Sequence, residues 1–227
     1  MHRILIPLLF GLIGAAVLIS LGTWQMQRLA WKEEILTGIE SRITAEPVAL
    51  PESPNPDSDK YLPVIASGTL GMPEVHVLVS SKKRGAVYRV IQPFETEGRR
   101  ILVDMGTIPL DEKHTARAQP EVTLTGNLHW PQEIDSYTPE ADVADNIWFA
   151  RDVLKMAETL QTEPILLVVR KTSQTVANLT PLPVDTVGIP NDHLEYAITW
   201  FSLSAIWLVM TGYFFWRMRH KPEGTET

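Results

Sequence analysis

The sequence predicts a membrane α+β protein, with two transmembrane helices flanking a mostly antiparallel β-sheet or barrel-like outer domain that carries one or two helices. Two observations predict this class. Hydrophobic residues make up 44% of the 227-residue chain, and the longest apolar runs stand near its two ends. Between them lie short runs rich in Val, Ile, Leu and Thr and bounded by Gly or Pro, which is the pattern of β-strands joined by turns.

The first apolar run extends from Ile4 to Leu21 and is followed by Trp24 and Arg28. A tryptophan at the membrane surface with a cation just beyond it is typical of a retained anchor. We therefore predict a first transmembrane helix over residues 4–24, with a helical extension to about residue 43. The alternative is a cleaved signal peptide, but no Ala-x-Ala site follows the run.

The second apolar run, from Tyr196 to Trp216, contains no charged residue and is long enough to cross a hydrocarbon core of about 30 Å. It predicts a second transmembrane helix over residues 194–216 and a tail over residues 217–227. Two spans place both termini on one side of the membrane. Arg3 before the first span and the basic residues after the second predict that this side is the cytoplasm, or the matrix of a mitochondrion.

The segment between the spans, residues 45–190, is predicted to be a β-rich domain on the outer side. A proline-rich linker over residues 46–60 opens it, and residues 146–160 have helical spacing. The last strand, Ile165–Thr172, alternates poorly and should be buried on both faces. Glu97-Gly98 predicts a hairpin turn, and Lys82-Lys83-Arg84 a solvated hairpin tip. The other predicted strands are Val64–Leu70, Val75–Ser80, Ala86–Phe94, Arg100–Ile108 and Val122–Leu128.

Composition and motifs exclude several functions. The absence of cysteine excludes disulfides, thiolate metal sites and covalent haem attachment, and the net charge of −7 argues against nucleic acid. There is no His-x-x-x-His pair, nucleophile elbow, phosphate loop or dinucleotide fingerprint. His76 and His129 are interpreted as structural or exposed. The acidic residues Asp135, Glu140, Asp142 and Asp145 lack the order of a calcium loop and are interpreted as a solvated loop. The outer domain is therefore predicted to bind or to scaffold rather than to catalyse.

The outer ends of the two spans carry the richest chemistry. Trp24, Arg28 and Trp31, with Gln25 and Lys32 beside them, share one face of the first helix, and His193, Tyr196 and Trp200 form a stripe on the second. If the helices pack together, these residues predict an aromatic cleft with an imidazole and two cations at its rim. Such a cleft suits a haem, with His193 on the iron and Arg28 or Lys32 on the propionates. The alternative is an ordinary aromatic belt in which His193 is a polar helix cap.

Two terminal motifs extend this interpretation. Residues 21–32 read Leu-Gly-Thr-Trp-Gln-Met-Gln-Arg-Leu-Ala-Trp-Lys, and residues 191–201 read Asn-Asp-His-Leu-Glu-Tyr-Ala-Ile-Thr-Trp-Phe. They resemble the signatures Leu-Gly-x-Trp-Gln-x-x-Arg-x-x-Trp-Lys and Asn-Asn-His-x-x-Tyr-Ala-x-Thr-Trp-Phe of the Surf-one family (surfeit locus protein one, or Shy-one). Other matching positions fall in the expected order between them: Tyr61, Gly68, Gly85, Pro93, Leu102, Val103, Gly106, Pro109, Trp148 and Asp152.

The sequence departs from the family pattern in one strand. The family usually has Val-Asn-Arg-Gly-Trp-Val-Pro there, whereas residues 103–109 read Val-Asp-Met-Gly-Thr-Ile-Pro. A role of that arginine and tryptophan therefore cannot be transferred to this chain.

The resemblance implies an assembly factor for haem-copper cytochrome c oxidase, not an enzyme, with two spans and a large periplasmic or intermembrane-space domain. It implies transient binding of haem a, with the histidine that heads the second span, His193, as iron ligand. The implied partners are oxidase subunit I, haem a synthase and membrane lipid. Because no transit peptide precedes the first span, we expect a bacterial inner (plasma) membrane protein.

Two other hypotheses remain at this stage. The protein could be a scaffold that stabilises subunit I without binding a cofactor, in which case His193 caps its helix or touches the partner. It could also be an enzyme acting on haem or quinone at the membrane surface, although the sequence offers no acid–base constellation for that chemistry.

Overall fold

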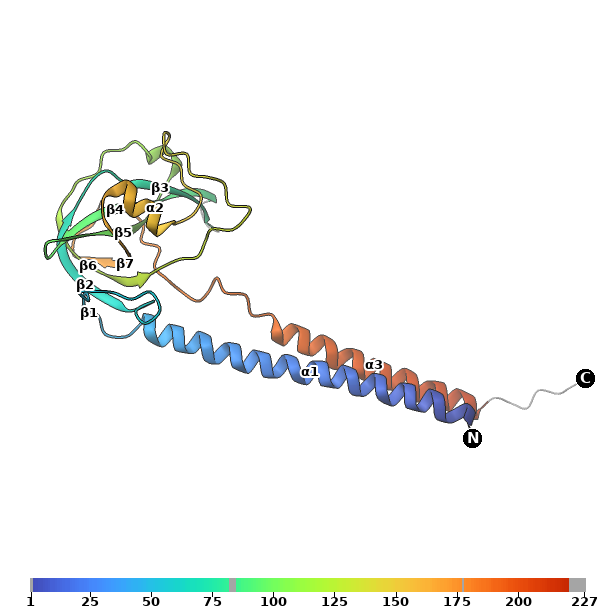
Figure 1. Ribbon diagram of the computed structural model, residues 1–227. Coiled ribbons are helices and arrows are strands. Elements are labelled where there is room, and N and C mark those ends of the chain that lie inside the picture. Colours follow the sequence, from blue (N-terminus) through green and yellow to red (C-terminus); the bar gives the residue numbers. More distant parts are fainter. Residues whose placement is uncertain (1, 82–84, 177, 221–227) are drawn as a thin grey trace, which may run out of the picture. The chain divides into compact units, whose positions relative to one another are not determined.

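The computed structural model describes residues 2–81, 85–176 and 178–220. The chain forms two compact units, one from Met1–Gly38 with Val187–Thr227 and the other from Ile39–Thr186. The first unit is a pair of helices and the second is a β-barrel domain (Figure 1). This is the membrane α+β class that the sequence predicts.

The helical unit is built from most of α1 (His2–Ile43) and from α3 (His193–Arg219). Both helices are long and apolar enough to cross a membrane, by length and composition. They lie side by side and antiparallel, so the start of α1 and the end of α3 are at the same end of the pair (Figure 1). The predicted pair of apolar helices is therefore confirmed.

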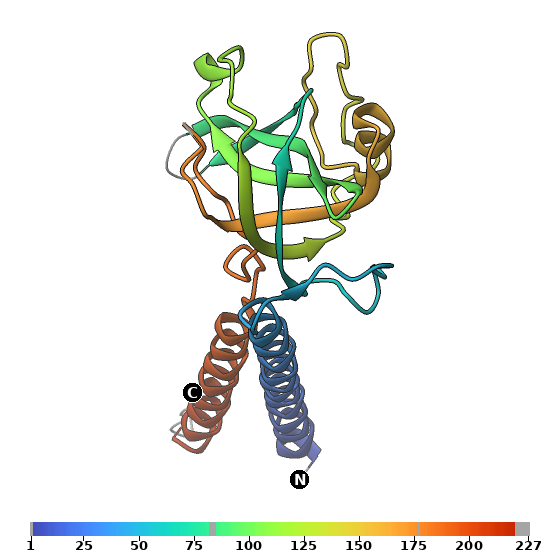
Figure 2. The same cartoon turned by 90° about the vertical axis from the view of Figure 1, so that its left-hand side faces the viewer.

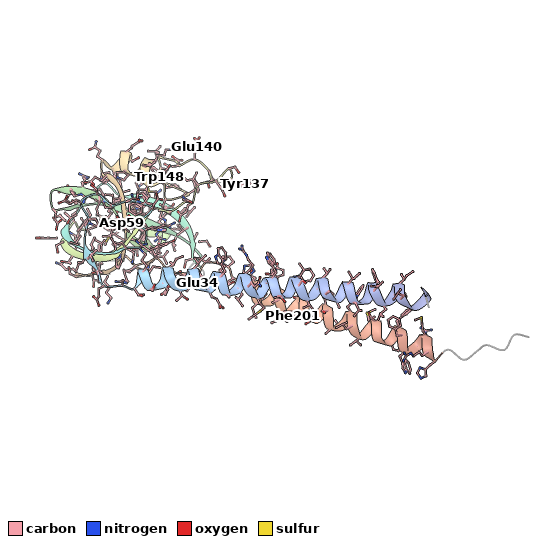
Figure 3. The ribbon with its side chains drawn as sticks, turned by 60° about the horizontal axis from the view of Figure 1, so that its bottom comes forward. Glu34, Asp59, Tyr137, Glu140, Trp148 and Phe201 are labelled. Carbon is pink, nitrogen blue, oxygen red and sulfur yellow. The ribbon has the colours of Figure 1, made fainter. Side chains whose placement is uncertain are left out.

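Small residues on α1 allow close packing of the two helices. A Cβ atom added to Gly14 would lie 2.6 Å from the indole of Trp207, and one added to Gly22 would lie 2.6 Å from the ring of Phe201. The indole nitrogen of Trp207 donates a hydrogen bond of 2.9 Å to the carbonyl oxygen of Gly11. Figure 3 shows Phe201 on α3 beside the ribbon of α1. Small residues of this kind let helices approach closely where the surrounding lipid offers no hydrophobic driving force.

The contact between the helices follows a heptad-like seam. Spacings of four and three residues alternate along each helix, as they do where two helices wind around one another with a left-handed twist. The less exposed residues of α1 that share this spacing are Gly11, Ala15, Leu18, Gly22, Gln25, Leu29 and Lys32. Those of α3 are His193, Ala197, Trp200, Ser204, Trp207 and Thr211.

Seven strands form the sheet, in the order β1-β2-β6-β7-β5-β4-β3. A further pairing of β2 with β4 closes β2, β6, β7, β5 and β4 into a barrel, which Figure 2 shows curling round on itself. Most pairs are antiparallel, whereas β1–β2 and β5–β7 are parallel. The strands are β1 (Val48–Ala49), β2 (Pro63–Leu70), β3 (Val75–Ser81), β4 (Gly85–Thr96), β5 (Arg99–Ile108), β6 (Glu121–His129) and β7 (Glu163–Thr172).

Three hydrophobic clusters stabilise the barrel domain, and the smallest contains Tyr88, Val90 and Ile108. The first contains Phe94, Val103 and Met105 together with inward residues of β2, β6 and β7. The second lies where α2 (Val153–Leu160) covers the sheet, and its largest member, Trp148, is 2% exposed (Figure 3). Residues 165–169 of β7 are buried throughout because one face points inward and the other lies under α2, which confirms the prediction for this part of the strand, whereas residues 170–172 are intermediate or exposed.

Two predicted elements differ from the structure. The helix predicted over residues 146–160 begins at Val153, where the Asp152 carboxylate accepts a hydrogen bond of 3.1 Å from the amide of Lys155. Trp148, before it, is extended, because its amide and carbonyl bond to the backbone of His76 and Leu78 in β3. The predicted linker over residues 46–60 contains the short strand β1, which was not predicted. The short 3-10 helix η1 (Leu110–Glu112), which follows β5, was not predicted either.

Of the two predicted hairpin turns, the structure tests one. Glu97 and Gly98 both have positive φ, as a tight hairpin turn between β4 and β5 requires, so that prediction is confirmed. The predicted hairpin tip Lys82-Lys83-Arg84 lies outside the described residues.

Candidate functional site

The candidate site is built around His193, the first residue of α3. Its ring is half-buried on the seam, and Nδ1 lies 2.7 Å from Oε1 of Gln25 on α1. Because an amide oxygen can only accept, Nδ1 carries the proton and donates it. The Asp192 side chain makes no capping hydrogen bond to the start of α3.

This tautomer leaves the other ring nitrogen, Nε2, with a free lone pair. Within the described part of the chain, Nε2 makes no hydrogen bond. Metal-bound histidines usually have this arrangement, since a partner on one nitrogen fixes the ring and raises the basicity of the other. The donor set at the head of α3 therefore fits a haem iron that needs one neutral imidazole.

The predicted aromatic residues lie partly on the seam and partly beside it. Trp200 is half-buried on the seam, whereas Tyr196 is 57% exposed. Trp24 and Trp31 are 52% and 49% exposed. The structure therefore brings His193 and Trp200 together with Gln25 at the contact between the helices, and it leaves Tyr196, Trp24 and Trp31 as exposed flanks.

The two predicted cations are in different environments. The guanidinium of Arg28 lies 4.3 Å from the ring centroid of Trp31, which is a cation–π contact on the surface of α1. Lys32 lies on the seam, half-buried, and its ammonium donates to the carbonyl oxygen of Pro190. An ammonium has three donors, so Lys32 retains capacity for an anion, and the Arg28 side chain is exposed.

Gln25 was placed beside the predicted face of the first helix, but it was given neither a role nor a partner. It is 9% exposed, and its position seven residues from both Leu18 and Lys32 puts it on the seam. A polar residue at a seam position of an apolar helix is the signal that could have revealed it, because such a residue needs a partner on the facing helix.

The barrel domain holds a buried ion-pair cluster around Glu74. Its carboxylate accepts hydrogen bonds from Arg117 and from Nε2 of His76, the latter at 2.8 Å. Burial alone would raise the pKa of Glu74, but the bonds from His76 and Arg117 outweigh it and lower the pKa to about 2. The imidazole Nδ1 of His76 faces the amide of Asn146 at 3.2 Å. Every ring nitrogen of His76 is thus engaged, which agrees with its structural interpretation.

A second buried network contains the strand that departs from the family pattern. Asp104 is fully buried and binds the guanidinium groups of Arg89 and Arg151, and Arg151 also binds Glu133. Met105, at the position of the usual arginine, is 1% exposed in the barrel core. The two carboxylates and two guanidinium groups of this network balance in formal charge.

The remaining candidates give no metal centre. Among the residues that the structure describes, no group of three or more His, Asp or Glu side chains could hold a metal ion. In the acidic loop, Asp135 accepts hydrogen bonds from the amide of Tyr137 and the hydroxyl of Thr138, so it closes a local turn.

The comparisons with known proteins agree with the two terminal motifs. The family model described as the SURF1 family matches residues 12–205. The chain belongs to the SURF1 family. It is 32% identical to Surfeit locus protein 1 of Homo sapiens over 212 residues, which covers 82% of this chain and 70% of that protein.

Two further SURF1 relatives extend this likeness. Surfeit locus protein 1 of Takifugu rubripes is 30% identical over 86% of this chain and 91% of its own length. The SURF1-like protein of Drosophila melanogaster is 28% identical over 86% of this chain and 73% of its own length. Membership of the SURF1 family supports a role in the assembly of cytochrome c oxidase.

Proposed function

We propose that this SURF1-family protein binds haem a transiently and helps its insertion into subunit I of cytochrome c oxidase. The observation that carries the proposal is the His193–Gln25 contact, which holds the imidazole with Nε2 free at the outer end of the helix pair.

In this proposal each residue of the site has a separate task. His193 would hold the haem iron through Nε2, and Gln25 orients the ring. Trp200 and Tyr196 on α3 and Trp24 on α1 give the macrocycle apolar contacts. The guanidinium of Arg28, placed by its stacking on Trp31, and the ammonium of Lys32 meet the propionate groups. Bound haem a supplies an iron centre that accepts an imidazole, and the chain supplies its orientation.

Release is as necessary as binding for a carrier. A single imidazole ligand on a half-open surface binds less firmly than the buried axial ligands of an enzyme, so the haem can pass to a site with stronger ligation. The other partners in the proposal are haem a synthase as the donor and membrane lipid around the spans. The proposed location is a bacterial inner membrane, with both termini cytoplasmic and the barrel domain periplasmic.

The test is the visible spectrum of the full chain, purified after co-expression with haem a synthesis. We expect a haem a band in the wild type and its loss in His193→Ala. The matched control is His220→Ala at the far end of α3, where the ring bonds the carbonyl of Trp216 in its own helix and should not affect haem. Unchanged haem content in a folded His193→Ala protein contradicts the proposal.

A scaffold without a cofactor is the second candidate function. The same Nδ1–Oε1 contact favours it, because a hydrogen bond across the seam ties the helices together whether or not iron is bound. A colourless wild-type protein that still retains subunit I in a pull-down experiment would support the scaffold.

A further inference from the structure

Two apolar hollows lie along the helix pair. The first, with a volume of about 530 Å³, lies between Val17 and Leu18 of α1 and Leu203, Ile206 and Met210 of α3. The second, of about 260 Å³, lies between Phe10 of α1 and Phe214 of α3. Trp207 and Met210 line both hollows, so they form one continuous groove along one side of the pair.

Helical spacing brings this groove to the candidate site. Residues seven apart lie almost on one line along a helix, so Tyr196 continues the line of Leu203 and Met210 on α3. On α1, Trp24 and Arg28 follow Val17 by seven and eleven residues and lie on the same side. Seven residues of helix rise about 10 Å, so the groove begins roughly 10 Å below the ring of Tyr196.

The groove and the site together are amphipathic. At the outer end stand an imidazole with a free Nε2 and the cation of Arg28, whereas the lining farther along is apolar from Leu203 to Phe214. A ligand that fits both parts has a metal-binding, carboxylate-bearing head and a long hydrocarbon tail. A phospholipid would meet the cation and the groove but would make no use of the imidazole lone pair.

We infer that the groove seats the farnesyl tail of haem a while His193 and Arg28 hold its head. This inference rests on the proposed function and adds to it a way of selecting haem a from haem b, which has no tail. The tail runs from the ring of Tyr196 past Leu203 and Trp207 toward Phe10 and Phe214.

The affinity gained when the groove holds the tail comes from close packing. In a bilayer the tail is already surrounded by hydrocarbon, so the groove adds close contacts and a fixed direction rather than a hydrophobic driving force. We therefore expect the tail to raise affinity by roughly tenfold, not by many orders of magnitude.

The experiment titrates three haems into the full chain in phosphatidylcholine nanodiscs, followed by visible absorption. Haem a and haem o carry the tail, and haem b lacks it. Leu203→Trp fills the groove, and Leu208→Trp is the matched control, because both leucines are 43% exposed and Leu208 lies outside the groove lining. We expect wild type and Leu208→Trp to bind haems a and o about tenfold more tightly than haem b. In Leu203→Trp that preference should fall to about twofold, with haem b affinity unchanged.

The outcomes separate the two proposals. Equal binding of all three haems by the wild type, or equal loss of all three in Leu203→Trp, overturns the groove assignment and leaves the iron ligand intact. Absence of any haem binding by the wild type overturns the proposed function itself. If native mass spectrometry finds a phospholipid that Leu203→Trp expels while haem a affinity is unchanged, the groove is a lipid site and the inference is wrong.

Discussion

His193 and Gln25 face each other across the helix seam, with Nδ1 and Oε1 2.7 Å apart. Farther along the pair, in the middle of α3, the indole nitrogen of Trp207 donates a hydrogen bond to the carbonyl oxygen of Gly11. Each of these contacts places a polar group where it would otherwise lack a partner, and together they fix the register of α1 against α3. The contact that fixes the register where α3 begins is therefore the same one that sets the direction of the imidazole.

Replacing Gln25 by leucine should weaken haem binding without removing the iron ligand. The substitution keeps the seam filled but leaves Nδ1 without its acceptor, so the ring can rotate and its basicity falls. Loss of such an outer-shell partner typically costs tenfold or more in metal affinity, and we expect about tenfold here, measured by haem titration of the full chain. Gln27→Leu is the control, because Gln27 is exposed two residues away. Equal affinities for the two variants would contradict the orienting role.

Replacing Gly14 by leucine should separate the two helices. A Cβ atom at Gly14 would lie 2.6 Å from the Trp207 indole, so the helices must move apart or the indole must leave its contact with Gly11. We expect haem binding to fall and the distance between spin labels on the two helices to increase. In the control, Gly212→Leu, a Cβ atom meets nothing within 4 Å, so both measurements should stay at wild-type values. An unchanged distance in Gly14→Leu would show that the seam is not packed as described.

The helices and most of the strands could be predicted because their signals are local. A charge-free run such as Tyr196–Trp216 is stable as a helix in an apolar environment, so its composition alone predicts it. The turn at Glu97-Gly98 is likewise predicted by two adjacent residues. The error at residues 146–152 has a different origin. Trp148 has helical spacing to Met156, but its backbone pairs with β3, and no local pattern reveals a partner some seventy residues away.

Most residues of the candidate site stand out in the sequence, but their arrangement does not. The position of His193 at the head of the apolar run is visible in the sequence, and so is the stripe of Trp24, Arg28 and Trp31. Which face of α1 meets α3 depends on where the small residues Gly11 and Gly22 allow contact. That choice turns Gln25 toward His193 and leaves the stripe exposed beside the seam.

The barrel should lose stability as the pH falls, in part through His129. Burial is the main cause that lowers the pKa of His129 to about 4, followed by the charges of Arg151 and Lys60. Its Nδ1 has no hydrogen bond partner within the described residues, so the charged form finds no acceptor there. Between its ordinary pKa of 6.5 and about 4, the unfolded chain takes up a proton that the folded barrel does not. Stability is therefore fully present above 6.5 and falls as the pH drops toward 4.

The measurement is hydrogen exchange of β6 in the full chain across that pH range. We expect the wild type to lose on the order of 2 kcal/mol of protection free energy, after correction for intrinsic exchange rates. His129→Phe keeps the ring that stacks on Tyr61, at 5.5 Å between centroids, and should flatten the dependence. His114→Phe, at an exposed position, is the control and should behave as wild type. If the protection free energy of His129→Phe falls with pH as steeply as that of the wild type, another group causes the acid sensitivity.

Gly106 should be far less replaceable than Gly98, although both have positive φ. A Cβ atom at Gly106 would lie 2.1 Å from the carbonyl oxygen of Thr180, whereas one at Gly98 meets nothing within 4 Å. Next to Gly106, the backbones of Thr107 and Thr180 exchange hydrogen bonds of 2.8 and 3.0 Å. An alanine at position 106 must therefore push the segment around Thr180 away from β5.

We expect Gly98→Ala to cost about 1 kcal/mol, from backbone strain alone. Gly106→Ala should cost about 3 kcal/mol or more, because the displaced segment also loses both backbone hydrogen bonds and its contact with the barrel. Denaturant unfolding of the two full-length variants measures the difference. Similar losses of unfolding free energy in the two variants would mean that the residues near Thr180 move aside at little cost. The close contact at Gly106 would then not be required for the stability of the barrel.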